Sequence, residues 1–210
     1  MVKAVLFDMD GVLADTEWFY NRRRCAFLET KGFEFDEIPD LSGSNEEAIW
    51  KYFVPDDAEL RERLRTEYSG YQKTHPVPYA ELLNRDARPV MKELHERGIK
   101  TAIASSGYVE LIQELVDIAD LGDVLDFQIS GHECRAFKPD PEVYLRAMDA
   151  LGVQPGDSLV VEDSPLGIQA GKAAGCRVLA LRPHEGVHLN QSAADRVIDS
   201  LWDILGEIDR

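Results

Sequence analysis

The chain has 210 residues and a formal net charge of −16, from 23 basic and 39 acidic residues. This length allows one ordinary domain, or a core that carries a smaller inserted domain. Nucleic-acid binding normally shows a basic footprint, so the acidic excess argues against a nucleic-acid partner. The apolar N-terminal run meets Asp8 and Asp10, so it is too short and too acidic for a signal peptide or membrane span. We therefore expect a cytoplasmic protein without a membrane partner.

The first predicted element is a buried strand at residues 2–7, which runs into a turn at 8–11. After it, apolar spacings of three and four predict helices at 17–30, 45–53 and 56–68. Asn45 precedes two acidic residues, which is typical of a helix N-cap. Because residues 15–84 show no strand pattern, we interpret them as a helical segment inserted after the first strand.

Strands and helices alternate through the rest of the chain. A helix at 88–97 ends at Gly98, a residue that favours helix termination. Further strands are predicted at 99–104, 126–130, 158–161 and 177–181, with helices at 109–118, 139–151 and 165–174. This alternation is typical of an α/β fold in which helices cover both faces of a parallel sheet.

Polar side chains stand at four of the predicted strand ends. They are Asp8 and Asp10 after the first strand, Ser105 after the second, Lys138 after the third, and Glu162 and Asp163 after the fourth. In an open parallel sheet, ligands bind outside the carboxyl ends of the strands. These side chains, distant in sequence, are therefore expected to meet in one crevice.

The acidic residues of this group predict a metal site. Asp8 and Asp10 are two residues apart, so in an extended chain their side chains point to the same side. Such carboxylates repel each other unless a cation lies between them, and Glu162 and Asp163 add to the negative charge. Mg²⁺ prefers oxygen ligands and is the usual ion where phosphate is the substrate.

The other residues of the group suit a phosphate. Lys138 can offset negative charge and bind a phosphoryl oxygen. Ser105, with the backbone N–H groups of Ser106 and Gly107, can hold another oxygen at the start of a helix. Each residue alone is more commonly a cap, a turn or a solvated charge. Their occurrence together at four strand ends favours a functional site.

Four segments of the chain resemble the four motifs of the haloacid dehalogenase superfamily. They are DMDGVLADTE (8–17), AIASSG (102–107), KPDPEVY (138–144) and VVEDSPLGIQAGKAAG (160–175). The C-terminal ADRVIDSLWDIL also resembles the ending of the β-phosphoglucomutase-like branch. The resemblance implies a Rossmann-like, three-layer parallel-sheet core of residues 1–14 and 85–210, with an inserted helical cap domain of residues 15–84.

The resemblance also implies roles for the residues at the strand ends. Asp8 would be the nucleophile, and Asp10 the general acid and then the general base. Lys138 and Ser105 would bind the transferring phosphoryl group, together with Ser106 and Gly107. The implied Mg²⁺ ligands are Asp8, the backbone carbonyl of Asp10, Glu162 and Asp163.

Departures from the family pattern favour a phosphatase over a mutase. Tyr20 stands where β-phosphoglucomutases have a cap-linked histidine, and Asn45 is nearest to their arginine for a second phosphate. The expected activity is hydrolysis of a small phosphorylated metabolite, a sugar or polyol phosphate, by a monomeric enzyme through a phospho-aspartyl intermediate. A sugar phosphomutase and a catalytically idle binding protein are the alternatives. Candidate contacts for the leaving group are Trp18, Tyr20, Asn21, Arg24, Asn45 and Lys73.

Overall fold

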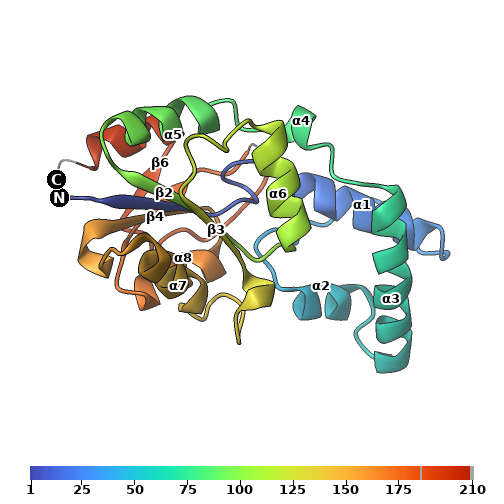
Figure 1. The fold of residues 1–210 in the computed structure, drawn as a ribbon. Helices are drawn as coiled ribbons and strands as arrows, with labels where there is room; N and C mark the ends of the chain where they lie inside the picture. The colour runs from blue at the N-terminus through green and yellow to red at the C-terminus, as the bar shows by residue number, and fades with distance from the viewer. Residues whose placement is uncertain (185, 209–210) are drawn as a thin grey trace.

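A six-stranded sheet in the order β3-β2-β1-β4-β5-β6 forms the centre of the molecule (Figure 1). The computed structural model describes residues 1–184 and 186–208. All five strand pairings are parallel. The strands are β1 (Ala4–Phe7), β2 (Lys100–Ser105), β3 (Phe127–Ser130), β4 (Ser158–Glu162), β5 (Arg177–Leu181) and β6 (Arg196–Ile198). The predicted α/β class with a parallel sheet is confirmed.

The two faces of the sheet pack against different helices. Val5 and Phe7 of β1 face a core formed with α5 (Ala87–Glu96), α6 (Val109–Ile118) and the 3₁₀ helix η3 (Leu201–Gly206). Ala4 and Leu6 face the opposite core, formed with α7 (Glu142–Leu151) and α8 (Pro165–Ala173). Neighbouring residues of a strand point to opposite faces. A strand covered on both sides must therefore be apolar throughout, as the sequence of β1 is.

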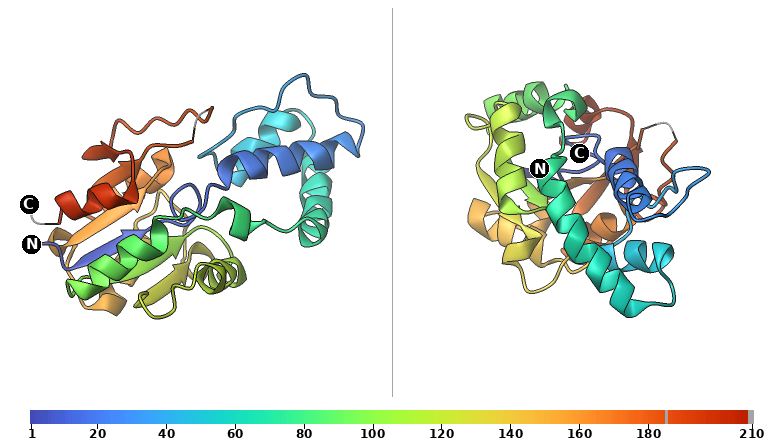
Figure 2. Two further views of the ribbon diagram at one scale, coloured as in Figure 1. Left: turned by 90° about the horizontal axis from the view of Figure 1, so that it is seen from above. Right: turned by 90° about the vertical axis from the view of Figure 1, so that its right-hand side faces the viewer.

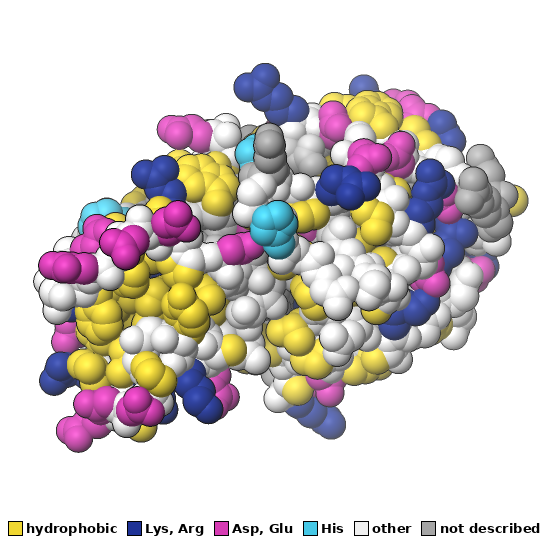
Figure 3. All heavy atoms as spheres, turned by 180° about the vertical axis from the view of Figure 1, so that it is seen from behind, with side chains coloured by type: hydrophobic (Ala, Val, Ile, Leu, Met, Phe, Trp, Pro, Cys, Tyr) yellow, Lys and Arg dark blue, Asp and Glu magenta, His cyan; other side chains and the backbone are white. Residues whose placement is uncertain are grey.

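Three helices form a separate layer at one end of the sheet (Figure 2). They are α1 (Glu17–Glu29), α2 (Glu46–Phe53) and α3 (Ala58–Thr74), and we call this layer the cap. Its own core includes Phe27, Trp50 and Tyr68, with the Phe27 and Tyr68 ring centroids 5.3 Å apart. Hydrophobic side chains also gather on the outer surface at this end (Figure 3). Within the described ranges, no helix has the length and apolarity needed to cross a membrane.

Two linkers join the cap to the sheet, and they run side by side. The backbone N–H of Asp15 donates to the carbonyl of Leu82 at 2.8 Å, and that of Asn84 donates to Leu13 at 2.9 Å. The Asn84 side chain also donates to the carbonyl of Val12 at 2.9 Å. These bonds lie at the predicted domain boundaries of 14/15 and 84/85. They support that division, which stays a prediction.

Among the strands and α-helices, the structure differs most from the sequence-based expectation at β6, α4 and α3. The edge strand β6 (Arg196–Ile198) was not predicted, because it has three residues and two of them are exposed. The single turn α4 (Tyr79–Leu82) is too short to show helical periodicity. Helix α3 continues to Thr74 rather than ending near Tyr68. Gly70 and the polar residues after it weaken the pattern there, although the backbone remains helical.

Candidate active site

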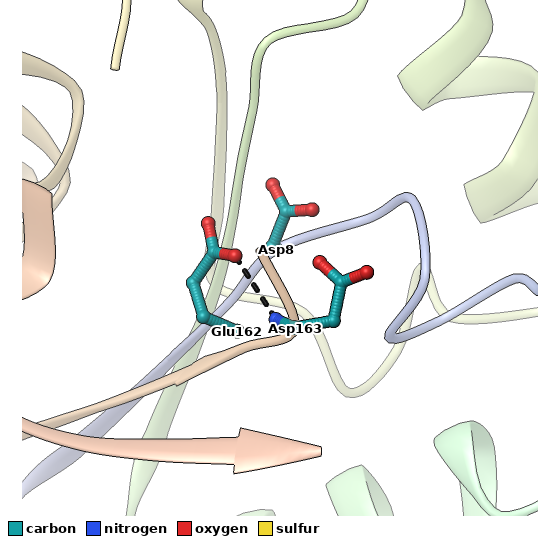
Figure 4. Close-up of side chains that lie close together, drawn as sticks. All are labelled: Asp8, Glu162 and Asp163. Atoms are coloured by element: carbon teal, nitrogen blue, oxygen red, sulfur yellow. Dashed lines mark hydrogen bonds between the residues drawn. The ribbon is translucent and has the colours of Figure 1, made fainter. Parts of the chain in front are cut away.

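The strand ends bring three carboxylates together. Phe7 of β1 pairs with Val161 of β4, so Asp8 follows β1 at the level where β4 ends at Glu162 and Asp163 follows. These three residues each place a carboxylate oxygen within 4.8 Å of the others. They project from two adjacent strands into a common space (Figure 4). All three are buried, so their charges need compensation from within the site.

Lys138 provides part of that compensation. Its Nζ lies 2.5 Å from Asp8 Oδ1 and 2.6 Å from Glu162 Oε1. Burial by itself would lower the pKa of Lys138, but the charges of the two carboxylates raise it well above its ordinary value. The side chain is therefore an ammonium ion. The structure thus brings Lys138 to the predicted nucleophile across 130 residues of sequence.

Glu162 is anchored through both of its oxygens. Oε1 also accepts a hydrogen bond from the Tyr144 hydroxyl at 2.9 Å. Oε2 accepts from the backbone N–H of Asp163 and from both the N–H and the hydroxyl of Ser164. Burial would raise the pKa of Glu162, but Lys138 and these donors hold it below its ordinary value. Glu162 is therefore a fixed negative charge, and it positions Lys138.

Asp163 has an oxygen without a protein partner. Among the described residues, no group donates a hydrogen bond to its buried Oδ2. A Cβ added at Gly11 would lie 2.0 Å from this oxygen, and Gly11 has a φ of +76°. Burial and the charge of Glu162 raise the pKa of Asp163 well above its ordinary value, and burial raises that of Asp8 to about 8. An unpartnered carboxylate oxygen beside Asp8 fits a divalent cation with oxygen ligands.

Asp10 is oriented by residues that follow it on the first motif and on α1. Its Oδ1 accepts hydrogen bonds from Thr16 Oγ1 at 2.6 Å and from the Tyr20 hydroxyl at 2.8 Å. Burial raises the pKa of Asp10, and these two donors oppose the rise. The side chain lies outside the three-carboxylate group, as expected if only its backbone carbonyl serves a metal.

The loop after β2 lies beside this carboxyl group. Ser105 is fully buried and its Oγ accepts from the backbone N–H of Gly107 at 2.9 Å. Ser130 donates to the Gly107 carbonyl at 2.5 Å. A Cβ at Gly107 would lie 3.9 Å from Asp10 Oδ2. The structure therefore brings Ser105 and Gly107 to the site, whereas the Ser106 side chain is exposed.

The predicted cap contacts fall into two groups. Tyr20 reaches Asp10, and buried Asn21 donates to Ser42 Oγ at 3.2 Å. Asn45 caps α2 by accepting from the N–H of Ala48, as its sequence context predicted, and Lys73 is exposed on α3. Thr16 and Tyr144 were not predicted, although both lie in the segments that resemble family motifs. Their hydroxyls are recognisable as site groups only once their carboxylate partners are placed.

The fold and the site define a class of enzyme. A Rossmann-like core, an inserted helical cap, and a lysine among carboxylates at the strand ends occur together in this chain. Residues 2–175 match the family of haloacid dehalogenase-like hydrolases. The chain belongs to this family, as the motif resemblance predicted.

Known relatives agree with this assignment. The chain is 32% identical over 178 residues to the phosphorylated carbohydrates phosphatase of Thermotoga maritima, covering 83% of this chain and 82% of the relative. It is 28% identical to hexitol phosphatase A of Escherichia coli, covering 96% and 93%. The β-phosphoglucomutase structure from Clostridium difficile superposes with a TM-score of 0.76 at 21% identity, covering 99% and 97%, and shows the shared fold. The names of the sequence relatives agree with the predicted phosphatase class.

Proposed function

We propose that the protein is a Mg²⁺-dependent phosphatase that hydrolyses a small phosphorylated sugar or polyol through a phospho-aspartyl intermediate on Asp8. The observation that carries the proposal is the unpartnered Asp163 oxygen beside Asp8, with Lys138 fixed between Asp8 and Glu162. The substrate class is supported by relatives named as a phosphorylated carbohydrates phosphatase and a hexitol phosphatase.

The residues present fit the metal. Asp8 and Asp163 would hold Mg²⁺ directly, and the carbonyl of Asp10 and Glu162 complete the predicted set. When bound, the ion supplies positive charge that offsets the phosphoryl oxygens. Both Glu162 oxygens already accept hydrogen bonds from the protein. The main contribution of Glu162 is therefore to keep Lys138 in place.

The side chains suit a two-step transfer. Asp8 forms a bond from its carboxylate oxygen to phosphorus while the bond to the ester oxygen breaks, and Asp10 gives that oxygen a proton. Water then attacks phosphorus and passes a proton to Asp10, and the bond to Asp8 breaks. Lys138 and Ser105 hold phosphoryl oxygens throughout. Burial raises the pKa of Asp10, which suits a group that must carry a proton in the first step.

The test compares Asp8→Asn with Asp10→Ala by acid-quenched mass spectrometry after incubation with p-nitrophenyl phosphate and Mg²⁺. An amide is a poor nucleophile, so Asp8→Asn should show no phosphorylated protein and no turnover. The p-nitrophenolate leaving group needs little protonation, so Asp10→Ala should become phosphorylated slowly and release phosphate slowly.

Two results would contradict the proposal. A phosphorylated Asp8→Asn protein would place the nucleophile elsewhere, and so would modification mapped to another residue in the wild type. Circular dichroism of both variants serves as the folding control. Loss of turnover in Asp8→Asn supports Asp8 as the nucleophile only if the fold is retained.

A further inference from the structure

A carboxyl group that the mechanism does not use lies at the boundary between cap and core. Glu17 begins α1, directly after the Thr16 that contacts Asp10. Its Oε2 accepts from the backbone N–H of Gly43 at 3.1 Å, and the Ser42 hydroxyl donates to the same carboxyl group. Asn21 in turn donates to Ser42 Oγ at 3.2 Å, which leaves the Ser42 hydrogen for Glu17. All the identified partners of Glu17 are donors, so it is built as an acceptor.

This acceptor lies next to the reacting groups. Burial, and then the charge of Asp10, raise the pKa of Glu17 to about 7. Glu17 in its turn is one of the charges that raise the pKa of Asp163, after burial and Glu162. Thr16, the chain neighbour of Glu17, donates to Asp10 Oδ1 at 2.6 Å. Glu17 is therefore adjacent in the chain to a residue that contacts the active site.

The loop that holds Glu17 touches the core beside the same site. A Cβ added at Gly43 would lie 3.0 Å from Pro165 Cδ and 3.6 Å from Ser164 Cβ. Ser164 and Pro165 directly follow Asp163. The same cap loop also accepts, through Asp40 Oδ2, a hydrogen bond from the backbone N–H of His188 at 2.9 Å. The carboxyl group of Glu17 is thus fixed where the cap loop meets the segment after β4.

Two of the nearby cations are already paired with acids, and a third, Arg23, donates to the Tyr68 hydroxyl and the His75 carbonyl. Arg24, seven residues along α1, places Nη2 2.8 Å from Glu46 Oε1. Lys138 lies between Asp8 and Glu162. A second acidic group on a substrate would therefore approach Glu17 with no free cation from either residue. A hydroxyl group would instead donate a hydrogen bond to an acceptor that is already oriented.

We infer that Glu17 is a specificity-determining residue, which selects a leaving group with a hydroxyl near the phosphate ester and rejects one with a carboxylate or second phosphate there. The inference rests on the proposed phosphatase function. It narrows the substrate class to neutral polyhydroxylated monophosphates. Phosphorylated acids and bisphosphates are then poor substrates.

A matched substrate pair tests the inference at a pH above the pKa of Glu17, where its carboxylate is charged. Glycerol 3-phosphate and 3-phosphoglycerate differ only in a hydroxymethyl group against a carboxylate. The wild type should favour glycerol 3-phosphate in kcat/KM by about tenfold or more, because like charges close together in a protein repel by that order or greater. Glu17→Gln keeps the shape and removes the charge, so the ratio should narrow at least about fivefold. Glu17→Asp keeps the charge and should retain the preference.

Glu47→Gln is the matched control. Glu47 is an exposed acid in the first turn of α2, so the variant has the same net charge as Glu17→Gln but should keep the wild-type ratio. An unchanged ratio in folded Glu17→Gln would overturn the inference. A wild type that prefers 3-phosphoglycerate would overturn it even if Glu17→Gln did not fold.

A protein that is not a phosphatase would give a different result from a phosphatase in which Glu17 has no role in specificity. p-Nitrophenyl phosphate carries neither a hydroxyl nor a second acid on its leaving group. Wild type that neither hydrolyses it nor becomes phosphorylated on Asp8 refutes the phosphatase proposal itself. Hydrolysis of this ester, with a substrate ratio that ignores the charge at residue 17, refutes only the role of Glu17.

Discussion

The Tyr144 hydroxyl offers a clean measure of how firmly the Glu162–Lys138 pair is held. Tyr144 is fully buried and donates to Glu162 Oε1 at 2.9 Å, so Tyr144→Phe removes one hydroxyl without opening a cavity. Lys138 still donates to the same oxygen, so the buried Glu162 Oε1 keeps a hydrogen-bond donor. A hydrogen bond to a charged group contributes about 1.5–3 kcal/mol to the free energy of unfolding. For a protein of this size, the melting temperature should fall by about 3–12 °C.

The loss of unfolding free energy in Tyr144→Phe should depend on pH in a defined direction. The pKa of folded Glu162 lies below its ordinary value of 4.5. Its stabilising contribution is therefore complete above the unfolded pKa and is lost as pH falls through the folded pKa. Removing a donor raises the folded pKa. The difference in unfolding free energy between wild type and Tyr144→Phe should thus be full near pH 7 and shrink below about pH 4.5.

Urea unfolding at a series of pH values measures this difference. Tyr108→Phe is the control, because Tyr108 is 58% exposed and its loss should change stability by less than about 0.5 kcal/mol. Equal stability of Tyr144→Phe and wild type at pH 7 would refute the reasoning. So would a difference that grows as the pH falls.

Two further predictions concern the metal. Gly11→Ala should reduce Mg²⁺ affinity, measured by calorimetry, by tenfold or more (about 1.4 kcal/mol or more), because its Cβ would lie 2.0 Å from Asp163 Oδ2. Gly32→Ala is the control: Gly32 has a φ of +88° and its added Cβ would meet nothing within 4 Å, so the variant shares the backbone strain but should bind Mg²⁺ normally. Equal Mg²⁺ affinities of the two variants would count against Asp163 as a ligand. Excess EDTA should abolish phosphatase activity and Mg²⁺ should restore it, whereas Ca²⁺, with its looser geometry, should inhibit; full activity in EDTA would exclude a metal requirement.

Much of the fold could be read from the sequence, because parallel strands covered on both faces are continuous apolar runs. The pattern at residues 177–181 predicts β5 with its observed bounds, and that at 109–118 does the same for α6. The edge strand β6 could not be predicted, because Arg196 and Val197 are exposed and the segment lacks a buried apolar run. Short elements at the edge of a sheet are set by pairing with a neighbour rather than by their own pattern.

The residues of the site also fall into those that the sequence predicts and those that it does not. Groups at strand ends were predictable, since topology alone brings Asp8, Lys138 and Asp163 to one edge of the sheet. Groups in the cap were not, because periodicity shows which face of a helix is apolar but not how the helix lies over the core. For Asn45 the structure confirms the predicted N-cap of α2, and its contact with the leaving group stays a prediction. The sequence pattern does not single out Glu17, whose chain neighbour Thr16 contacts Asp10.

The paired linkers make the cap an exchangeable module. Leu13 is hydrogen-bonded to Asn84, and Asp15 to Leu82, so the chain leaves and re-enters the core at adjacent points. The helices between them pack mainly around their own aromatic cluster. A different helical insert, or a tight turn alone, can therefore be grafted between residues 15 and 82 while Asp8, Lys138 and Glu162 keep their hydrogen-bond partners. Asp10 would lose its donors Thr16 and Tyr20, so the graft must supply replacements. Such chimaeras would separate the chemistry of the core from the choice of substrate made by the cap.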